Sequence, residues 1–168
     1  GSYTYSWNSS PIQATATATN LSVGIYTVTI TDANNCIATA TATITQPLPL
    51  TVTSSVTSAI GCYGGNGTVT VTASGGTAPY LGTGVITVVA GTYTYIITDA
   101  NGCQATTSVT VSEPTQLTAS SAVTTSVLCN GGGGVVTVSA SGGTMPYTGK
   151  GTINVTAGSH TFTVTDAN

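Results

Sequence analysis

The sequence repeats itself at a fixed interval. The tetrapeptide Thr-Asp-Ala-Asn occurs three times, with its aspartate at Asp32, Asp99 and Asp166, so the residue number rises by 67 each time. We call this spacing the repeat interval. It also separates Cys36 from Cys103, Cys62 from Cys129, Pro47 from Pro114, Pro79 from Pro146, and Tyr80 from Tyr147. A fixed interval of this kind predicts a series of similar structural units that follow one another along the chain.

The interval divides the chain into three segments. Residues 48–115 form one complete unit, which we call the middle segment. Residues 1–47 are the C-terminal part of an earlier unit (the first segment), and residues 116–168 are the N-terminal part of a later one (the last segment). Because both ends cut through a unit, we expect the sequence to be a window on a longer array.

Each unit has the pattern of short β-strands. In the middle segment, Thr or Ser alternates with Val, Ile or Tyr over residues 51–58, 68–74, 85–89, 92–98 and 104–112, with a weaker segment at Tyr80. Gly-rich and Asn-Gly breakers separate these runs. The first segment is longer and has room for an extra strand at residues 13–19. We therefore predict an all-β fold of tandem immunoglobulin-like β-sandwich repeats with a period of 67, joined by short, stiff proline linkers.

The composition excludes several classes of function. Charged residues make up 3% of the chain, and Lys150 is the single basic residue apart from His160. One lysine cannot neutralise a nucleic-acid backbone or anchor the chain to acidic lipids. No apolar run approaches the roughly 20 residues of a membrane helix. Hydrophobic residues make up 40%, which also disfavours intrinsic disorder.

The recurring aspartates suggest either turn capping or calcium binding. Calcium usually takes six to eight oxygen ligands, often from several carboxylates. Each unit offers only one aspartate, and Glu113 is the single further carboxylate. We therefore interpret Asp32, Asp99 and Asp166 as residues that cap a hairpin turn by accepting backbone N–H bonds, and we expect no metal.

The aromatic residues are interpreted as packing residues. Tyr26 and Tyr93 follow a glycine at the start of a strand and resemble the tyrosine corner of β-sandwiches, in which the hydroxyl bonds nearby backbone. His160, the only imidazole, stands one repeat interval after Tyr93 and takes the same position. Trp7 is expected to pack in the core, although stacking on a sugar is an alternative.

The sequence contains no arrangement of residues that supports catalysis. Hydroxyl groups are abundant, but no base is positioned by sequence to activate one. Carboxylates at equivalent positions belong to different units and cannot flank one bond. We expect no enzymatic activity and no cofactor.

The four cysteines indicate an oxidising compartment. Their spacing is not that of a metal site. Cys62 and Cys103 are candidates for a disulfide within one unit, which would leave Cys36 and Cys129 without partners. Cys62 also suits a bond to the cysteine of the next unit, because the two turns face each other when units lie end to end. Free thiols are the third alternative.

Several of these motifs together resemble the SprB repeat family. The matching residues are Gly91 to Thr94, Thr98 to Cys103, Cys62 to Gly67 and Ala73 to Tyr80, and Gly1 to Trp7 resembles a longer family variant. The resemblance covers essentially the whole chain. It implies a very large surface adhesin of gliding Bacteroidetes, exported by a type IX secretion system. Family units often carry an aspartate in the Cys-x-Gly-Gly loop, which this chain lacks.

The resulting expectation is a structural role. The chain is expected to be a stalk segment of a filamentous adhesin, attached to the outer membrane at the cell surface and used in attachment and gliding motility. Its partners would be neighbouring repeats of the same chain, with the secretion or gliding machinery contacting parts outside this segment. The alternatives are a module that binds polysaccharide or other surfaces, and a subunit of a polymeric extracellular fibre.

Overall fold

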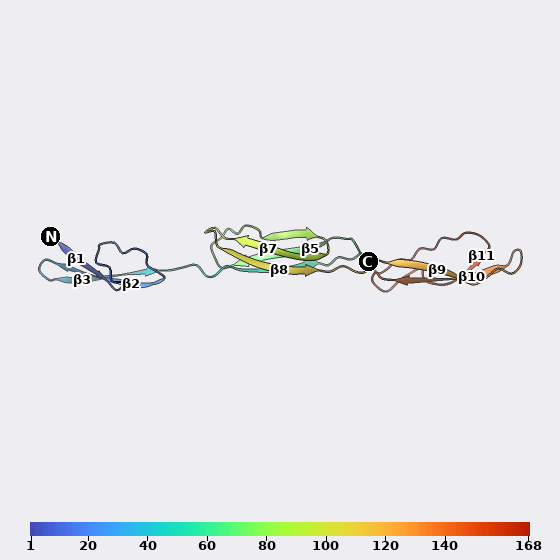
Figure 1. The fold of residues 1–168 in the computed structure, drawn as a ribbon, viewed down its shortest axis with the longest axis horizontal. Coiled ribbons are helices and arrows are strands. Elements are labelled where there is room, and N and C mark those ends of the chain that lie inside the picture. The colour runs from blue at the N-terminus through green and yellow to red at the C-terminus, as the bar shows by residue number, and fades with distance from the viewer. The chain divides into compact units, whose positions relative to one another are not determined.

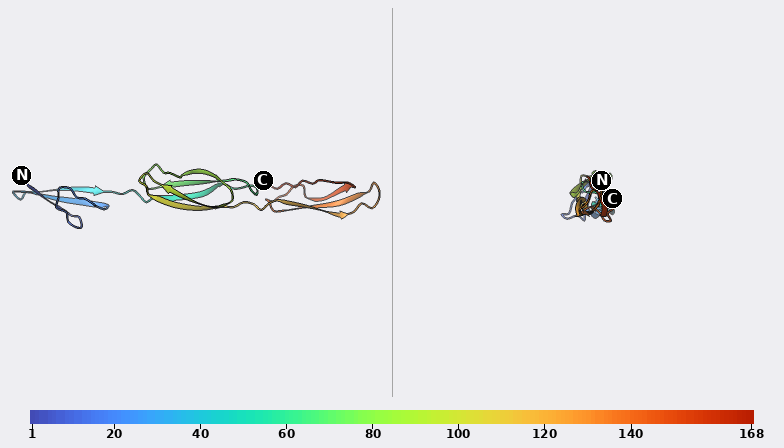
Figure 2. Two further views of the ribbon diagram at one scale, coloured as in Figure 1. Left: turned by 45° about the horizontal axis from the view of Figure 1, so that its top comes forward. Right: turned by 90° about the vertical axis from the view of Figure 1, so that its right-hand side faces the viewer.

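The computed structural model describes residues 1–168 and contains strands, turns and loops but no helix (Figures 1 and 2). Thr, Val and Ile, which dominate the chain, favour strands over helices, and the all-β prediction is confirmed. No helix capable of crossing a membrane is present. The chain forms two compact parts, which differ from the repeat units: Gly1–Pro49 and Leu50–Asn168.

The first compact part, Gly1–Pro49, is a three-stranded antiparallel sheet. It contains β1 (Tyr3–Trp7), β2 (Gly24–Asp32) and β3 (Ile37–Ile44), in the order β1-β2-β3. The strand predicted at residues 13–19 is wrong, because these residues form a loop without a partner strand. The side chain of Gln13 instead closes this loop, since its amide donates to the Thr19 carbonyl and its oxygen accepts from the Thr19 N–H, each at 2.9 Å.

The second compact part, Leu50–Asn168, contains the middle and last segments, and the middle segment forms two small sheets. One sheet consists of β4 (Thr51–Ser58), β5 (Gly67–Ser74) and β6 (Gly84–Val88), in that order. The other pairs β7 (Gly91–Thr98) with β8 (Gln104–Val111). The weak segment that follows Tyr80 contributes a single bridge, between Leu81 and Thr98.

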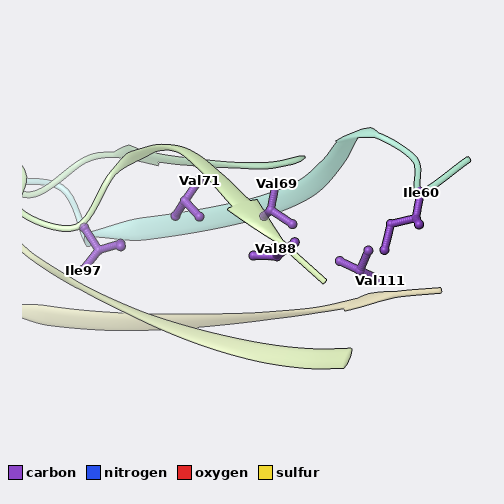
Figure 3. Close-up of a cluster of buried hydrophobic side chains, with 6 residues drawn as sticks. All are labelled: Ile60, Val69, Val71, Val88, Ile97 and Val111. Atoms are coloured by element: carbon purple, nitrogen blue, oxygen red, sulfur yellow. The ribbon is translucent and has the colours of Figure 1, made fainter. Parts of the chain in front are cut away.

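A small hydrophobic core lies between these two sheets (Figure 3). Because strand side chains point alternately to opposite faces, the valines of β5 point inward while its threonines point outward. β6, β7 and β8 each contribute one further buried side chain. The core consists of Ile60, Val69, Val71, Val88, Ile97 and Val111.

The last segment contains a single three-stranded sheet. Its strands are β9 (Thr118–Thr125), β10 (Gly133–Ser141) and β11 (Gly151–Thr156), with β10 in the centre. β9 begins one repeat interval after β4, and β11 begins one repeat interval after β6. Residues 159–164, which correspond to β7, form no strand, and only the bridge between Thr148 and Thr165 follows.

Candidate functional site

The Asp99 turn, residues 99–103, connects β7 to β8 and is organised by one carboxylate. Asp99 is 5% exposed. Its Oδ1 accepts N–H bonds from Asn101 at 2.9 Å and from Cys103 at 2.8 Å, and its Oδ2 accepts one from Thr77 at 2.9 Å. Asp99 therefore caps its own turn and also ties this turn to the loop after β5.

Hydrogen bonding keeps this carboxylate ionised. Burial acts to raise the pKa of Asp99, but the N–H groups of Thr77, Cys103 and Asn101 all favour the charged form. Together they lower the pKa below its ordinary value. With three amide donors and no second carboxylate beside it, this group is arranged as a structural cap.

The same turn occurs in the other two segments. Asp32 accepts N–H bonds from Asn34 and Cys36, both at 2.8 Å. Asp166 accepts from Thr144 at 2.9 Å and from Asn168 at 3.1 Å. No group of three or more His, Cys, Asp or Glu side chains could hold a metal ion together. In all three turns the carboxylate accepts bonds from backbone amides.

The asparagine of the turn adds a side-chain contact. Asn101 donates from Nδ2 to the Thr77 hydroxyl at 2.8 Å, and Asn168 donates to the equivalent Thr144 hydroxyl at 2.7 Å. Asn168 also donates to the carbonyl of Gly61 at 2.6 Å. Gly61 belongs to the middle segment, so this one amide connects the middle and last segments.

The structure does not bring Cys62 and Cys103 together, and all four cysteines are unpaired and exposed. Cys62 precedes β5 at the end of the sheet where Gly67 pairs with Val88. Cys103 precedes β8 at the opposite end, where Thr98 pairs with Gln104. A disulfide requires Cα atoms within about 7 Å, whereas an eight-residue strand spans about 26 Å. The bond within one unit is therefore not formed.

The position required for a bond between units is partly visible. The alternative in which Cys62 faces the next unit places it near Asn168. A Cβ atom added to Gly61, the neighbour of Cys62, would lie 3.6 Å from the Cβ of Asn168. The structure thus brings this loop to the following turn, and the disulfide itself stays a prediction.

The two predicted corner tyrosines bond the backbone four residues earlier. Tyr26 donates to the Ser22 carbonyl at 3.0 Å, and Tyr93 donates to the Val89 carbonyl at 3.1 Å. The His160 ring nitrogen makes the same contact to the Thr156 carbonyl at 2.9 Å. His160 therefore substitutes for a tyrosine in a structural position and has no acidic or nucleophilic partner.

The aromatic side chains of β1 lie on one face of the first sheet, where Tyr3 is 58% exposed and Tyr5 and Trp7 are half-buried. Tyr3, Tyr5 and Trp7 alternate along β1 and share one face. They lie opposite Asp32, Ile30 and Val28 of β2, and Val28 and Ile30 stand one repeat interval before the inward-facing Tyr95 and Ile97. Trp7 is half-buried and donates from its indole N–H to the Thr15 carbonyl at 3.0 Å. This face is the counterpart of the core face in the middle segment.

Hydroxyl pairs cover the outer faces of the strands. Thr53 bonds Thr72 at 2.8 Å, and Thr92 bonds Thr110 at 3.0 Å. Such cross-strand pairs stabilise a sheet without charge, which explains how the chain dispenses with ionic side chains.

No protein family, curated protein or solved structure matches this chain.

Proposed function

We propose that the chain is a structural stalk segment of a large filamentous adhesin at the cell surface. In this proposal it consists of tandem immunoglobulin-like β-sandwich repeats that recur at the repeat interval. It has no enzymatic activity and serves attachment and gliding motility outside the cell. The secretion or gliding machinery would contact other parts of the same protein.

The observation that carries the proposal is the correspondence of strands at the repeat interval. β9 and β11 begin one interval after β4 and β6, and the Asp turn recurs with the same spacing. A repeated unit that contributes a capped turn, hydroxyl-covered strands and a small core adds length and little else. The scarcity of charge also supports a spacer, because neighbouring units repel one another weakly.

A chain with one additional unit tests the stalk proposal. The variant duplicates residues 48–114, and small-angle X-ray scattering compares its maximum dimension with that of the original chain. We expect an increase of at least about 26 Å, the length of one eight-residue strand. An unchanged maximum dimension would contradict the stalk. Saturable binding of the original chain to immobilised polysaccharides would favour the binding module instead.

A further inference from the structure

The contact between Asn168 and Gly61 joins two segments through a side chain that is already held in place. The Asp166 carboxylate accepts the Asn168 N–H, and the Ala167 N–H donates to the Thr144 carbonyl at 3.0 Å. The Asn168 amide also donates to the Thr144 hydroxyl. Because its own segment fixes the donor, little conformational entropy is lost when the amide also bonds Gly61.

The acceptor side is equally well fixed. Gly61 lies between Ile60, which is buried in the core, and Cys62, whose carbonyl accepts from the Gly65 N–H at 3.0 Å. Glu113, which lies in the middle segment just after β8, accepts the Gly64 N–H at 2.6 Å. We call residues 60–67 the Cys62 loop. Two preformed surfaces therefore meet at the Asn168 amide.

The same donor is present one interval earlier. Asn101 bonds Thr77 as Asn168 bonds Thr144, and the Ala100 N–H donates to the Thr77 carbonyl at 2.8 Å. An asparagine amide carries two N–H donors, and the bond to threonine uses one of them. The acceptor is a backbone carbonyl, so it does not depend on the side chain at that position, which is Gly61 in one loop and Leu128 in the next.

We propose that the Asp-Ala-Asn turn is an inter-repeat clamp whose partner is the Cys62-type loop of the preceding repeat. The asparagine amide spans the junction, with one N–H on a threonine of its own repeat and the other on the preceding loop. The turn thus has two functions, since the aspartate closes the hairpin and the asparagine fixes the neighbouring repeat. The contact itself is independent of the proposed stalk function, whereas its use in stiffening a filament rests on that proposal.

Disulfide trapping tests the clamp geometry. In a chain whose four native cysteines are replaced by serine, Gly61→Cys is combined with Asn168→Cys. The Cβ separation of 3.6 Å lies within the range of about 3.5–4.5 Å found in disulfides. Oxidised glutathione accepts the two hydrogens as the two thiols form the bond. We expect near-complete intramolecular cross-linking, read as loss of two hydrogens by intact-mass spectrometry.

The matched control combines Gly61→Cys with Asn101→Cys. Asn101 occupies the same position in the equivalent turn, but it lies at the far end of β7 and β8 within the same segment as Gly61. This pair should keep both thiols free. Free thiols in the Asn168 pair, or equal cross-linking of both pairs, would overturn the clamp. If trapping fails while the lengthened chain still extends, the clamp is wrong and the stalk proposal stands.

A second measurement examines the native amide without added cysteines. Asn168→Ala removes the bridging donor to Gly61, together with its bond to the Thr144 hydroxyl in the last segment. In NMR relaxation measurements, we expect the last segment of this variant to tumble more independently of the middle segment than in the original chain. Identical tumbling in the two chains would show that the amide does not fix the junction.

Discussion

The middle and last segments contain equivalent three-stranded sheets, but only the middle segment has β8 (Figure 1). Val69 of β5 is fully buried, whereas its counterpart Val136 in β10 is 8% exposed. The difference is larger at the edge strand, where Val56 is 39% exposed and its counterpart Val123 is 68% exposed. The same sequence pattern therefore reaches different degrees of burial according to whether a second sheet covers it.

The local backbone also differs between the two segments. Residues 92–98 belong to β7 because they pair with β8, whereas residues 159–164 have no such partner and form no strand. A groove of about 360 Å³ lies beside them, lined in part by Val123, Val136, Val155 and Phe162. β8 therefore completes the middle segment in two ways, since it pairs with β7 and brings Val111 into the core.

Truncating equivalent valines in the two segments should give the largest difference. Val88→Ala removes buried methyl groups from the core, and we expect a loss of about 2 kcal/mol in the stability of the middle segment. Val155→Ala acts at the equivalent, half-buried position beside the groove and should cost less than about 1 kcal/mol. Hydrogen exchange read by mass spectrometry in β6 and β11 gives the loss of stability in each variant. Equal losses would show that β8 does not set the burial.

Supplying β8 as a separate strand should reduce the difference. A synthetic peptide with the sequence of residues 104–113 is expected to bind the last segment and protect residues 159–164 from hydrogen exchange. At ten times its Kd the peptide would stabilise that segment by about 1.4 kcal/mol. A control peptide with Val109→Asp and Val111→Asp should not bind, because a charge would lie against the valine side chains that line part of the groove. Equal protection by both peptides would contradict this role of β8.

The alternation of Thr with apolar residues predicted the strands of the middle segment closely. The predicted span 51–58 coincides with β4, and the other four spans differ from β5 to β8 by no more than one residue at either end. The same alternation failed at residues 13–19, although these residues repeat the Ala-Thr pattern of β3. β3 forms a strand because β2 lies beside it, whereas residues 13–19 have no partner strand. The pattern describes which side chains suit a sheet, and the partner decides whether a strand forms.

The turn chemistry was predictable from the sequence, but its long-range contact was only partly so. Asp followed by a small residue and Asn is typical of a capped turn, and the structure shows the expected bonds from Asn101 and Cys103 to Asp99. The bond from Thr77 depends on which loop lies opposite, which local sequence does not specify. The bond between Asn168 and Gly61 spans 107 residues, so it depends on how the strands of both segments run. Cysteine pairing depends on the same information.

The smallest expected effect concerns a hydroxyl that only the middle segment carries. Tyr95 of β7 is half-buried, and its hydroxyl is buried without a hydrogen-bond partner. The last segment has Phe162 at the equivalent position, and the first segment has Val28. An unpaired buried hydroxyl costs free energy on folding, because it loses its bonds to water and gains none. The two other segments therefore avoid a cost that the middle segment carries.

Replacing Tyr95 by the residue of the last segment should stabilise the middle segment. Tyr95→Phe removes the unpaired hydroxyl and keeps the ring, which lies 6.4 Å from the ring of Tyr93, so we expect a gain of about 1 kcal/mol in chemical denaturation. Tyr93→Phe is the matched control, because the Tyr93 hydroxyl donates to the Val89 carbonyl and its removal should destabilise the segment by about 1 kcal/mol. Opposite signs for two identical substitutions on one strand would show that hydrogen-bond satisfaction, and not ring packing, decides these positions. A loss of stability in both variants would instead mean that the Tyr95 hydroxyl has a partner in solution, such as a bound water.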